Sequence, residues 1–136
     1  GRQLVIASRA RKSASDQGTH RDLTSIYRGL SLLGREYIDM RLAKNGDNVC
    51  AREKFESRLN EINMDNRVSI HPDQAGQYGN TYYVTVDGKK YFLPSHLTKG
   101  GARDPQSVIR IYYTYDEEAE RVIVGHLPTH LENKLT

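Results

Sequence analysis

Apolar residues recur along the first half of the chain at alternating steps of three and four. The series comprises Leu23, Ile26, Leu30, Leu33, Tyr37 and Met40. This spacing places apolar side chains on one face of an α-helix, so the pattern predicts a long helix with one buried side. Thr19 stands three residues before Asp22, as in a capping box, and marks the expected start. Asn45-Gly46 marks the expected end, because glycine is favoured just beyond helix C-termini.

Weaker patterns flank this helix. Residues 4–6 (Leu-Val-Ile) suggest a short edge strand, and Ala10–Gly18 is small and polar, as expected of a linker or mobile arm. Residues from about Asn48 onward predict a second, shorter helix. Its inward positions are Phe55, Leu59 and Ile62. The expected organisation is an arm over residues 1–18, containing an edge strand and a linker, followed by one domain over residues 19–136.

The hydrophobic period changes from 3.6 to 2 after Arg67, and Val68 and Ile70 suggest a short strand. Residues 82–86 (YYVTV) and 89–93 (KKYFL) flank Asp87-Gly88. This arrangement predicts a β-hairpin with a type I′ turn, in which both turn residues take positive φ. A two-residue loop fixes the register. The expected pairs are Val86 with Lys89, Thr85 with Lys90, Val84 with Tyr91, Tyr83 with Phe92 and Tyr82 with Leu93.

A second hairpin is predicted near the C-terminus, after a loop from Ser95 to Gln106 that is rich in glycine and charge. Its strands span residues 108–115 and 121–126, with an acidic turn between them. Ile109, Ile111 and Tyr113 are expected on one face, and Arg110 and Tyr112 on the other. The fold class is therefore α+β, with two N-terminal helices packed on a mainly antiparallel sheet built from two β-hairpins.

Composition narrows the class of protein. The chain has 136 residues, enough for one domain with a core, and 37% of them are hydrophobic. No stretch approaches the roughly 20 apolar residues that a transmembrane helix needs, so no membrane partner is expected. The single cysteine, Cys50, cannot form an internal disulfide, which fits a reducing, cytoplasmic compartment. The net charge of +3 permits nucleic-acid binding without requiring it.

The last third of the chain concentrates side chains that suit phosphodiester chemistry. The candidate catalytic residues are Arg103, Arg110, Tyr112, His126 and His130. RNA cleavage without a metal needs a base for the ribose 2′-proton, an acid for the leaving oxygen, and cations over the phosphate. Histidine suits both proton transfers, and arginine suits the phosphate. His126 and His130 make only half of a metal site, so neither a metal nor another cofactor is expected.

Further basic residues are candidates for nucleic-acid binding. Lys90 lies on the first hairpin, and Lys99 begins a glycine-containing segment that ends at Arg103. Arg21, Arg28 and Arg35 recur every seven residues opposite the apolar face of the first helix. Such a stripe is either an ordinary solvated surface or a set of phosphate contacts.

The final hairpin resembles the closing strands of the RelE/ParE toxin superfamily. The resemblance rests on residues 109–113 (IRIYY), the acidic turn and residues 121–126 (RVIVGH). It implies an RNA- or ribosome-directed endoribonuclease, or a gyrase-directed toxin, that a protein antitoxin neutralises. Arg110 would correspond to the family's strand arginine, and His126 to the position beside its final catalytic segment. Lys90 would correspond loosely to basic residues on an earlier strand.

Two other classes of function remain open. The chain begins with Gly1 rather than methionine, as in a domain taken from a longer protein, and it could be a non-catalytic protein-interaction module of such a parent. It could also bind DNA through the Arg21, Arg28 and Arg35 stripe. An endoribonuclease predicts that Arg110, Tyr112 and His126 converge in one open groove. An interaction module predicts an apolar patch there instead.

Overall fold

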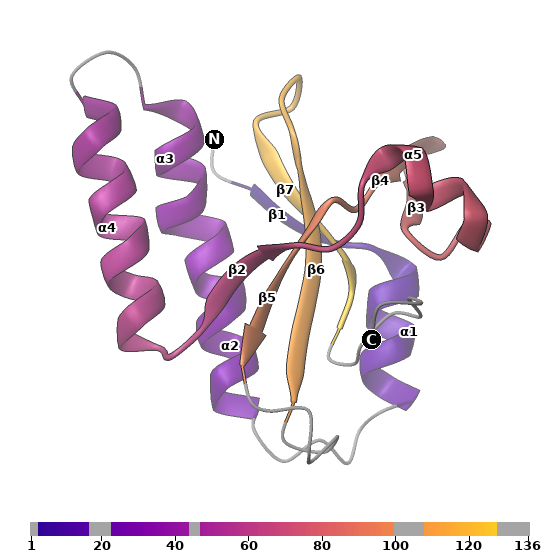
Figure 1. Ribbon diagram of the computed structural model, residues 1–136, viewed down its shortest axis with the longest axis horizontal. Coiled ribbons are helices and arrows are strands. Elements are labelled where there is room, and N and C mark those ends of the chain that lie inside the picture. The colour runs from indigo at the N-terminus through magenta and orange to yellow at the C-terminus, as the bar shows by residue number, and fades with distance from the viewer. Residues whose placement is uncertain (1–2, 17–22, 44–46, 100–107, 128–136) are drawn as a thin grey trace.

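A five-stranded sheet forms the centre of the protein in the computed structural model, which describes residues 3–16, 23–43, 47–99 and 108–127 (Figure 1). In sheet order the strands are β1 (Gln3–Ile6), β7 (Arg121–His126), β6 (Ile109–Asp116), β5 (Ser95–Lys99) and β2 (Asp65–Val68). β1 runs parallel to β7, and the other neighbours are antiparallel. The expected α+β class and the final hairpin are therefore confirmed.

One face of the sheet is covered by a helical layer (Figure 1). It consists of α2 (Leu23–Leu32), a π-helical turn η1 (Leu33–Tyr37), α3 (Ile38–Leu42) and α4 (Asp47–Glu61). Leu33, one of the predicted inward positions, is fully buried, and so is Ile38, which the predicted series does not include. Leu23 is 58% exposed, so its predicted inward position is wrong. The expected cap at Thr19 and stop at Asn45-Gly46 lie outside the described residues.

The opposite face is covered by α1 (Ser8–Asp16), α5 (Pro72–Ala75) with the 3-10 turn η2 (Gly76–Tyr78), and a small hairpin (Figure 1). The linker predicted over Ala10–Gly18 is therefore wrong for residues 10–16, which belong to α1. The small side chains of Ala7 and Ala10, which are 3% and 0% exposed, let α1 pack closely. Arg9 fixes it by donating hydrogen bonds to the carbonyls of Asn80, Thr81 and Tyr83.

The small hairpin joins β3 (Tyr83–Val86) and β4 (Lys89–Phe92) and has four of the predicted pairs. Beyond the strands, the Leu93 N–H donates a hydrogen bond to the Tyr82 carbonyl at 2.8 Å. Asp87 and Gly88 both take positive φ, 52° and 79°, as a type I′ turn requires. The hairpin forms a separate two-stranded sheet instead of extending the main one. Its inward side forms a second apolar core with the main sheet. That core includes Tyr82, Val84, Leu93, Tyr112 and Ile123.

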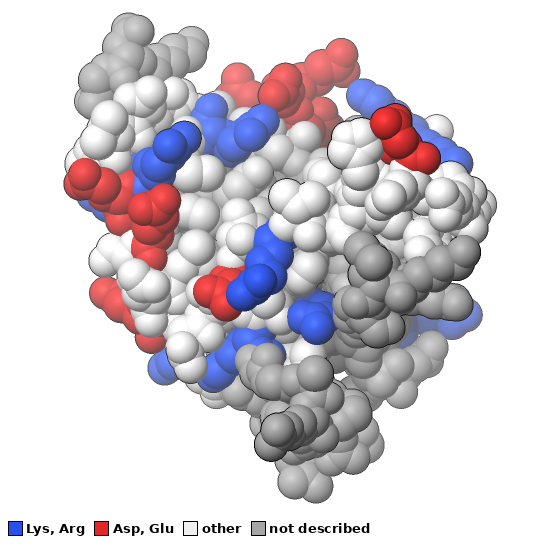
Figure 2. Space-filling model, viewed as in Figure 1, with Lys and Arg blue, Asp and Glu red and all other residues white. Residues whose placement is uncertain are grey.

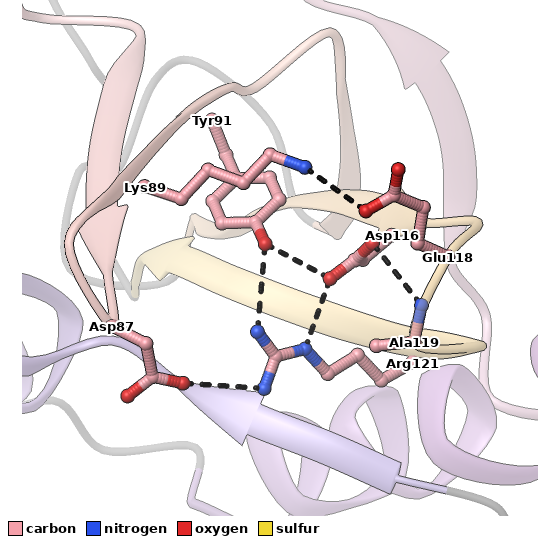
Figure 3. Close-up of polar contacts among 7 residues, drawn as sticks. All are labelled: Asp87, Lys89, Tyr91, Asp116, Glu118, Ala119 and Arg121. Atoms are coloured by element: carbon pink, nitrogen blue, oxygen red, sulfur yellow. Dashed lines mark hydrogen bonds and ion pairs between the residues drawn. The ribbon is translucent and has the colours of Figure 1, made fainter.

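A polar cluster ties the small hairpin to the turn between β6 and β7 (Figure 3). Asp116 accepts hydrogen bonds from the Tyr91 hydroxyl at 2.9 Å and from Arg121 Nε at 3.1 Å. The backbone N–H of Ala119 also donates to it. Burial alone would raise the pKa of Asp116, but these hydrogen bonds and the charge of Arg121 outweigh burial and hold that pKa below its ordinary value. The carboxylate therefore stabilises the contact between the two sheets.

The loop predicted from Ser95 is wrong for Ser95–Lys99, which form β5 between β2 and β6. Leu97 is fully buried at the centre of this strand. The polar residues around Leu97 are accommodated because two neighbouring strands satisfy the backbone. None of the helices in the described ranges has the length and apolar character needed to cross a membrane.

Candidate functional site

A row of four side chains crosses four neighbouring strands on the sheet face that lies opposite the helical layer. The backbone register pairs Arg67 of β2 with His96 of β5, His96 with Tyr112 of β6, and Tyr112 with His126 of β7. Directly paired residues on antiparallel strands project to the same side, with Cβ atoms about 5 Å apart. The ring centroids of His96 and Tyr112 are 5.0 Å apart, and those of Tyr112 and His126 are 6.0 Å apart.

A second row lies one step further along the same face. It pairs Asp65 of β2 with Thr98 of β5, and Thr98 with Arg110 of β6. Nη1 of Arg110 donates a hydrogen bond to Thr98 Oγ1 at 2.5 Å. Nε of Arg110 is buried and has no hydrogen-bond partner within the described part of the chain. Arg110 is therefore held in place at one nitrogen, while another N–H retains its donor capacity.

His96 is also contacted from the end of β2. The Ser69 hydroxyl lies 2.7 Å from its Nδ1. Ser69 is fixed in turn, because its backbone N–H donates to the Pro94 carbonyl at 2.7 Å. His96 is half-buried, as are Arg110 and His126, so each of these three side chains presents part of its surface to solvent.

Tyr112 has a different environment from its neighbours in the row. It is 1% exposed, and the Tyr82 ring packs on it at 6.2 Å in addition to the two imidazoles. The Tyr112 ring therefore lies between the imidazoles of His96 and His126 and is buried, while its catalytic role stays a prediction.

Three predicted residues, Arg110, Tyr112 and His126, therefore share one face. Arg110 and His126 are half-buried and Tyr112 is buried, and the open groove expected around them stays a prediction. The predicted binding residues Lys90 and Lys99 lie elsewhere. Lys90 is exposed on the small hairpin, with Nζ 4.4 Å from the centre of the Tyr83 ring. Lys99 projects towards the helical layer, where its Nζ lies 2.7 Å from Ser25 Oγ.

The predicted stripe lies on the helical layer, on the opposite side of the sheet from the row. Arg28 in α2 and Arg35 in η1 are both exposed there. Arg21, together with the predicted catalytic residues Arg103 and His130, lies outside the described residues. Of the described predictions beyond the shared face, Lys90, Lys99, Arg28 and Arg35 do not belong to the row.

Sequence reasoning missed Arg67, Ser69 and His96. The alternation His96-Leu97-Thr98, polar then apolar then polar, is a strand signal, but the glycine-rich continuation favoured a loop. Arg67 and Ser69 reach the site only because β2 pairs with β5, and this pairing joins segments that no local pattern connects.

Charge on the face that includes β2 is mixed. Figure 2 shows lysine and arginine side chains in small groups beside acidic ones, with wide uncharged areas between them. On β2, Arg67 forms an ion pair with Asp65 at 3.4 Å. Within the described ranges, no group of three or more His, Cys, Asp or Glu side chains is arranged to hold a metal ion.

A separate hollow of about 380 Å³ lies between α3 and α4 and is lined by residues that include Glu36, Asp39, Cys50 and Lys54. It contains none of the predicted site residues. The face of the sheet that carries the row therefore remains the candidate site.

Comparisons with protein-family models, with curated proteins and with solved structures find no match to this chain.

Proposed function

We propose that the domain is a metal-independent endoribonuclease whose site is the sheet face carrying His96, His126 and Arg110. The observation that carries the proposal is the cross-strand alignment of two half-buried imidazoles on either side of Tyr112, with the Arg110 guanidinium one step along the same face. Groups that exchange protons near neutral pH and a fixed cation are what metal-free phosphodiester cleavage requires.

The reaction follows from these groups. An imidazole takes the proton of the ribose 2′-hydroxyl, and the 2′-oxygen bonds to phosphorus while the bond from phosphorus to the 5′-oxygen breaks. An imidazolium returns a proton to that leaving oxygen, so the products are a 2′,3′-cyclic phosphate and a 5′-hydroxyl. Arg110 binds the charge that develops on the phosphate oxygens. His96 lies diagonally across from Arg110 in the sheet, and His126 lies beyond Tyr112.

The resemblance of the final hairpin to the RelE/ParE toxins supports this proposal, since that superfamily includes RNA- and ribosome-directed endoribonucleases. The partners proposed on the same basis are RNA or the ribosome and a neutralising protein antitoxin. Cytoplasmic localisation is proposed with them, and it agrees with the lone Cys50.

The test is incubation of labelled RNA with the purified protein in a chelator, with and without ribosomes. The single variants Arg110→Ala, His96→Ala and His126→Ala accompany the wild type, and Arg52→Ala is the control, because Arg52 is exposed on α4 in the helical layer. We expect cleavage by the wild type and the control, and a loss of about 100-fold or more when the acting imidazole is removed. No cleavage by the wild type, or equal cleavage by all variants, rejects the enzyme.

A second candidate is a protein-interaction domain. Leu23 and Tyr27 are 58% and 71% exposed and lie one helical turn apart on α2, so they expose apolar surface on the helical layer. This candidate replaces the first if the wild-type protein cleaves no RNA.

A further inference from the structure

β2 is an edge strand of the sheet as far as the described residues go, and the row described above ends on it with an exposed arginine. The Arg67 side chain is 65% exposed, and its register partner is His96, so the two side chains leave the sheet from neighbouring positions on the same face. Arg110 lies diagonally across from His96 on the other side, on β6. Diagonal neighbours in an antiparallel sheet are about 7 Å apart, within reach of long side chains. Two arginines therefore occupy the positions directly beside and diagonal to His96 near the β2 edge of the sheet.

The two arginines are prepared for a ligand in different ways. Arg110 keeps a buried Nε without a hydrogen-bond partner among the described residues. Arg67 is paired with Asp65 at 3.4 Å, but both side chains are about two-thirds exposed, so this contact is weak and readily exchanged. An incoming anion can displace the Asp65 carboxylate from Arg67 without leaving a buried charge behind.

We propose that Arg67, His96 and Arg110 form a phosphate subsite at the β2 edge, which binds the backbone of single-stranded RNA. The subsite rests on the proposed nuclease activity, and it is where the scissile phosphate binds. Arg67 and Arg110 donate to its non-bridging oxygens, and His96, which Ser69 orients, faces a bridging oxygen. A single strand is the substrate class because in-line attack by the 2′-oxygen requires a backbone rotation that a base-paired duplex resists.

Binding can be measured separately from cleavage with a fluorescent single-stranded DNA oligonucleotide, which has the phosphates but no 2′-hydroxyl. The wild type, Arg67→Ala, Arg67→Gln and Asp65→Asn are titrated at several salt concentrations, with Arg52→Ala as the control. We expect both Arg67 variants to bind about tenfold more weakly and to lower the slope of log affinity against log salt by about 0.7, the value for one phosphate contact on a single strand. Asp65→Asn should bind more tightly, because Arg67 loses its competing carboxylate.

Each outcome bears on a different claim. If the wild type does not bind the oligonucleotide, or if the Arg67 variants match Arg52→Ala, the subsite is rejected even where RNA is cleaved. If binding depends on Arg67 while wild-type protein cleaves no RNA in chelator, the subsite stands and the nuclease proposal fails. We expect Arg67→Gln to fold normally, because Arg67 is exposed and its replacement removes no core contact. Circular dichroism checks this expectation.

Discussion

The hydroxyl of Ser69 and Nδ1 of His96 lie 2.7 Å apart, although 27 positions separate the two residues in sequence. A hydroxyl oxygen can accept a hydrogen bond from Nδ1–H whether the imidazole is neutral or protonated. In the proposed reaction Nδ1 is engaged by Ser69 and Nε2 is the nitrogen that exchanges the proton. Ser69 is then a positioning residue, which acts on the substrate through His96.

The first prediction concerns this contact. Ser69→Ala should change the tautomer populations of His96, seen as a shift of its ring resonances in long-range ¹H–¹⁵N spectra, and should move the pH profile of RNA cleavage. Loss of one hydrogen bond worth about 1 kcal/mol corresponds to a rate decrease of about fivefold. Ser57→Ala, on the exposed surface of α4, is the control and should change neither measurement. Unchanged His96 resonances in Ser69→Ala would contradict the assignment.

The second prediction concerns Gly125, where β7 departs from regular pairing with β6. A Cβ atom there would lie 2.5 Å from Leu93 Cδ1 and 2.9 Å from Val84 Cγ1, inside the second core. Gly125→Ala should lower the free energy of unfolding by about 2 kcal/mol, because the core cannot absorb the extra methyl without strain. Urea titration measures the change. Gly76→Ala should cost much less, since nothing lies within 4 Å of that Cβ position and φ is −62°.

Local patterns predicted the hairpins well because a turn and its flanking strands determine each other. Asp87-Gly88 fixed the whole β3–β4 register, and the strands of the final hairpin begin and end within one residue of the predicted limits. The same patterns could not place the β3–β4 hairpin outside the main sheet, nor pair β1 with β7. Those arrangements depend on contacts between distant segments. The residues around Leu4 or Val124 do not indicate which strand each will pair with.

The candidate site was predicted only in part, because local patterns show which residues share a strand face but not which strands become neighbours. Arg110 and Tyr112 alternate along one strand, so their common face follows from the period of two. The burial of Tyr112 does not, because Tyr82, which lies just before β3, packs against it. His96 was hidden in a segment whose glycines and charges resemble a loop, and its strand conformation follows from pairing on both sides.

The third prediction concerns acid. The pKa of Asp116 is depressed in the folded protein, so its stabilising contribution is complete above the unfolded value, near 3.8, and is lost as the pH falls through and below that value. Asp116→Asn should lower the free energy of unfolding at pH 7 by about 3 kcal/mol, because Arg121 is left without its buried counter-charge. Below pH 4 the difference from wild type should shrink. Glu56→Gln, exposed on α4, is the control and should follow the wild-type curve.

The fourth prediction concerns alkali. Burial raises the pKa of Tyr113 far above its ordinary value of 10, and its hydroxyl donates to Asn66 at 2.6 Å. In alkali, the Tyr113 hydroxyl ionises more readily in the unfolded chain than in the folded protein. Its contribution to the free energy of unfolding is therefore complete below pH 10 and is lost as the pH rises above 10. Tyr113→Phe should be about 1 kcal/mol less stable at pH 7 but lose less stability between pH 10 and pH 11. Tyr27→Phe, 71% exposed, should reproduce the wild-type curve; an identical alkaline decline in Tyr113→Phe would refute the account.

The parallel pairing of β1 with β7 has a consequence for synthesis of the protein. Among the described strands of this sheet, β1 is synthesised first and β7 last, so none of these strands can pair with β1 until residues 121–126 have emerged. During translation its backbone groups and the side chains of Leu4 and Ile6 stay available to other chains or to chaperones. Nascent chains arrested before β7 should therefore aggregate more readily than chains in which β7 has emerged.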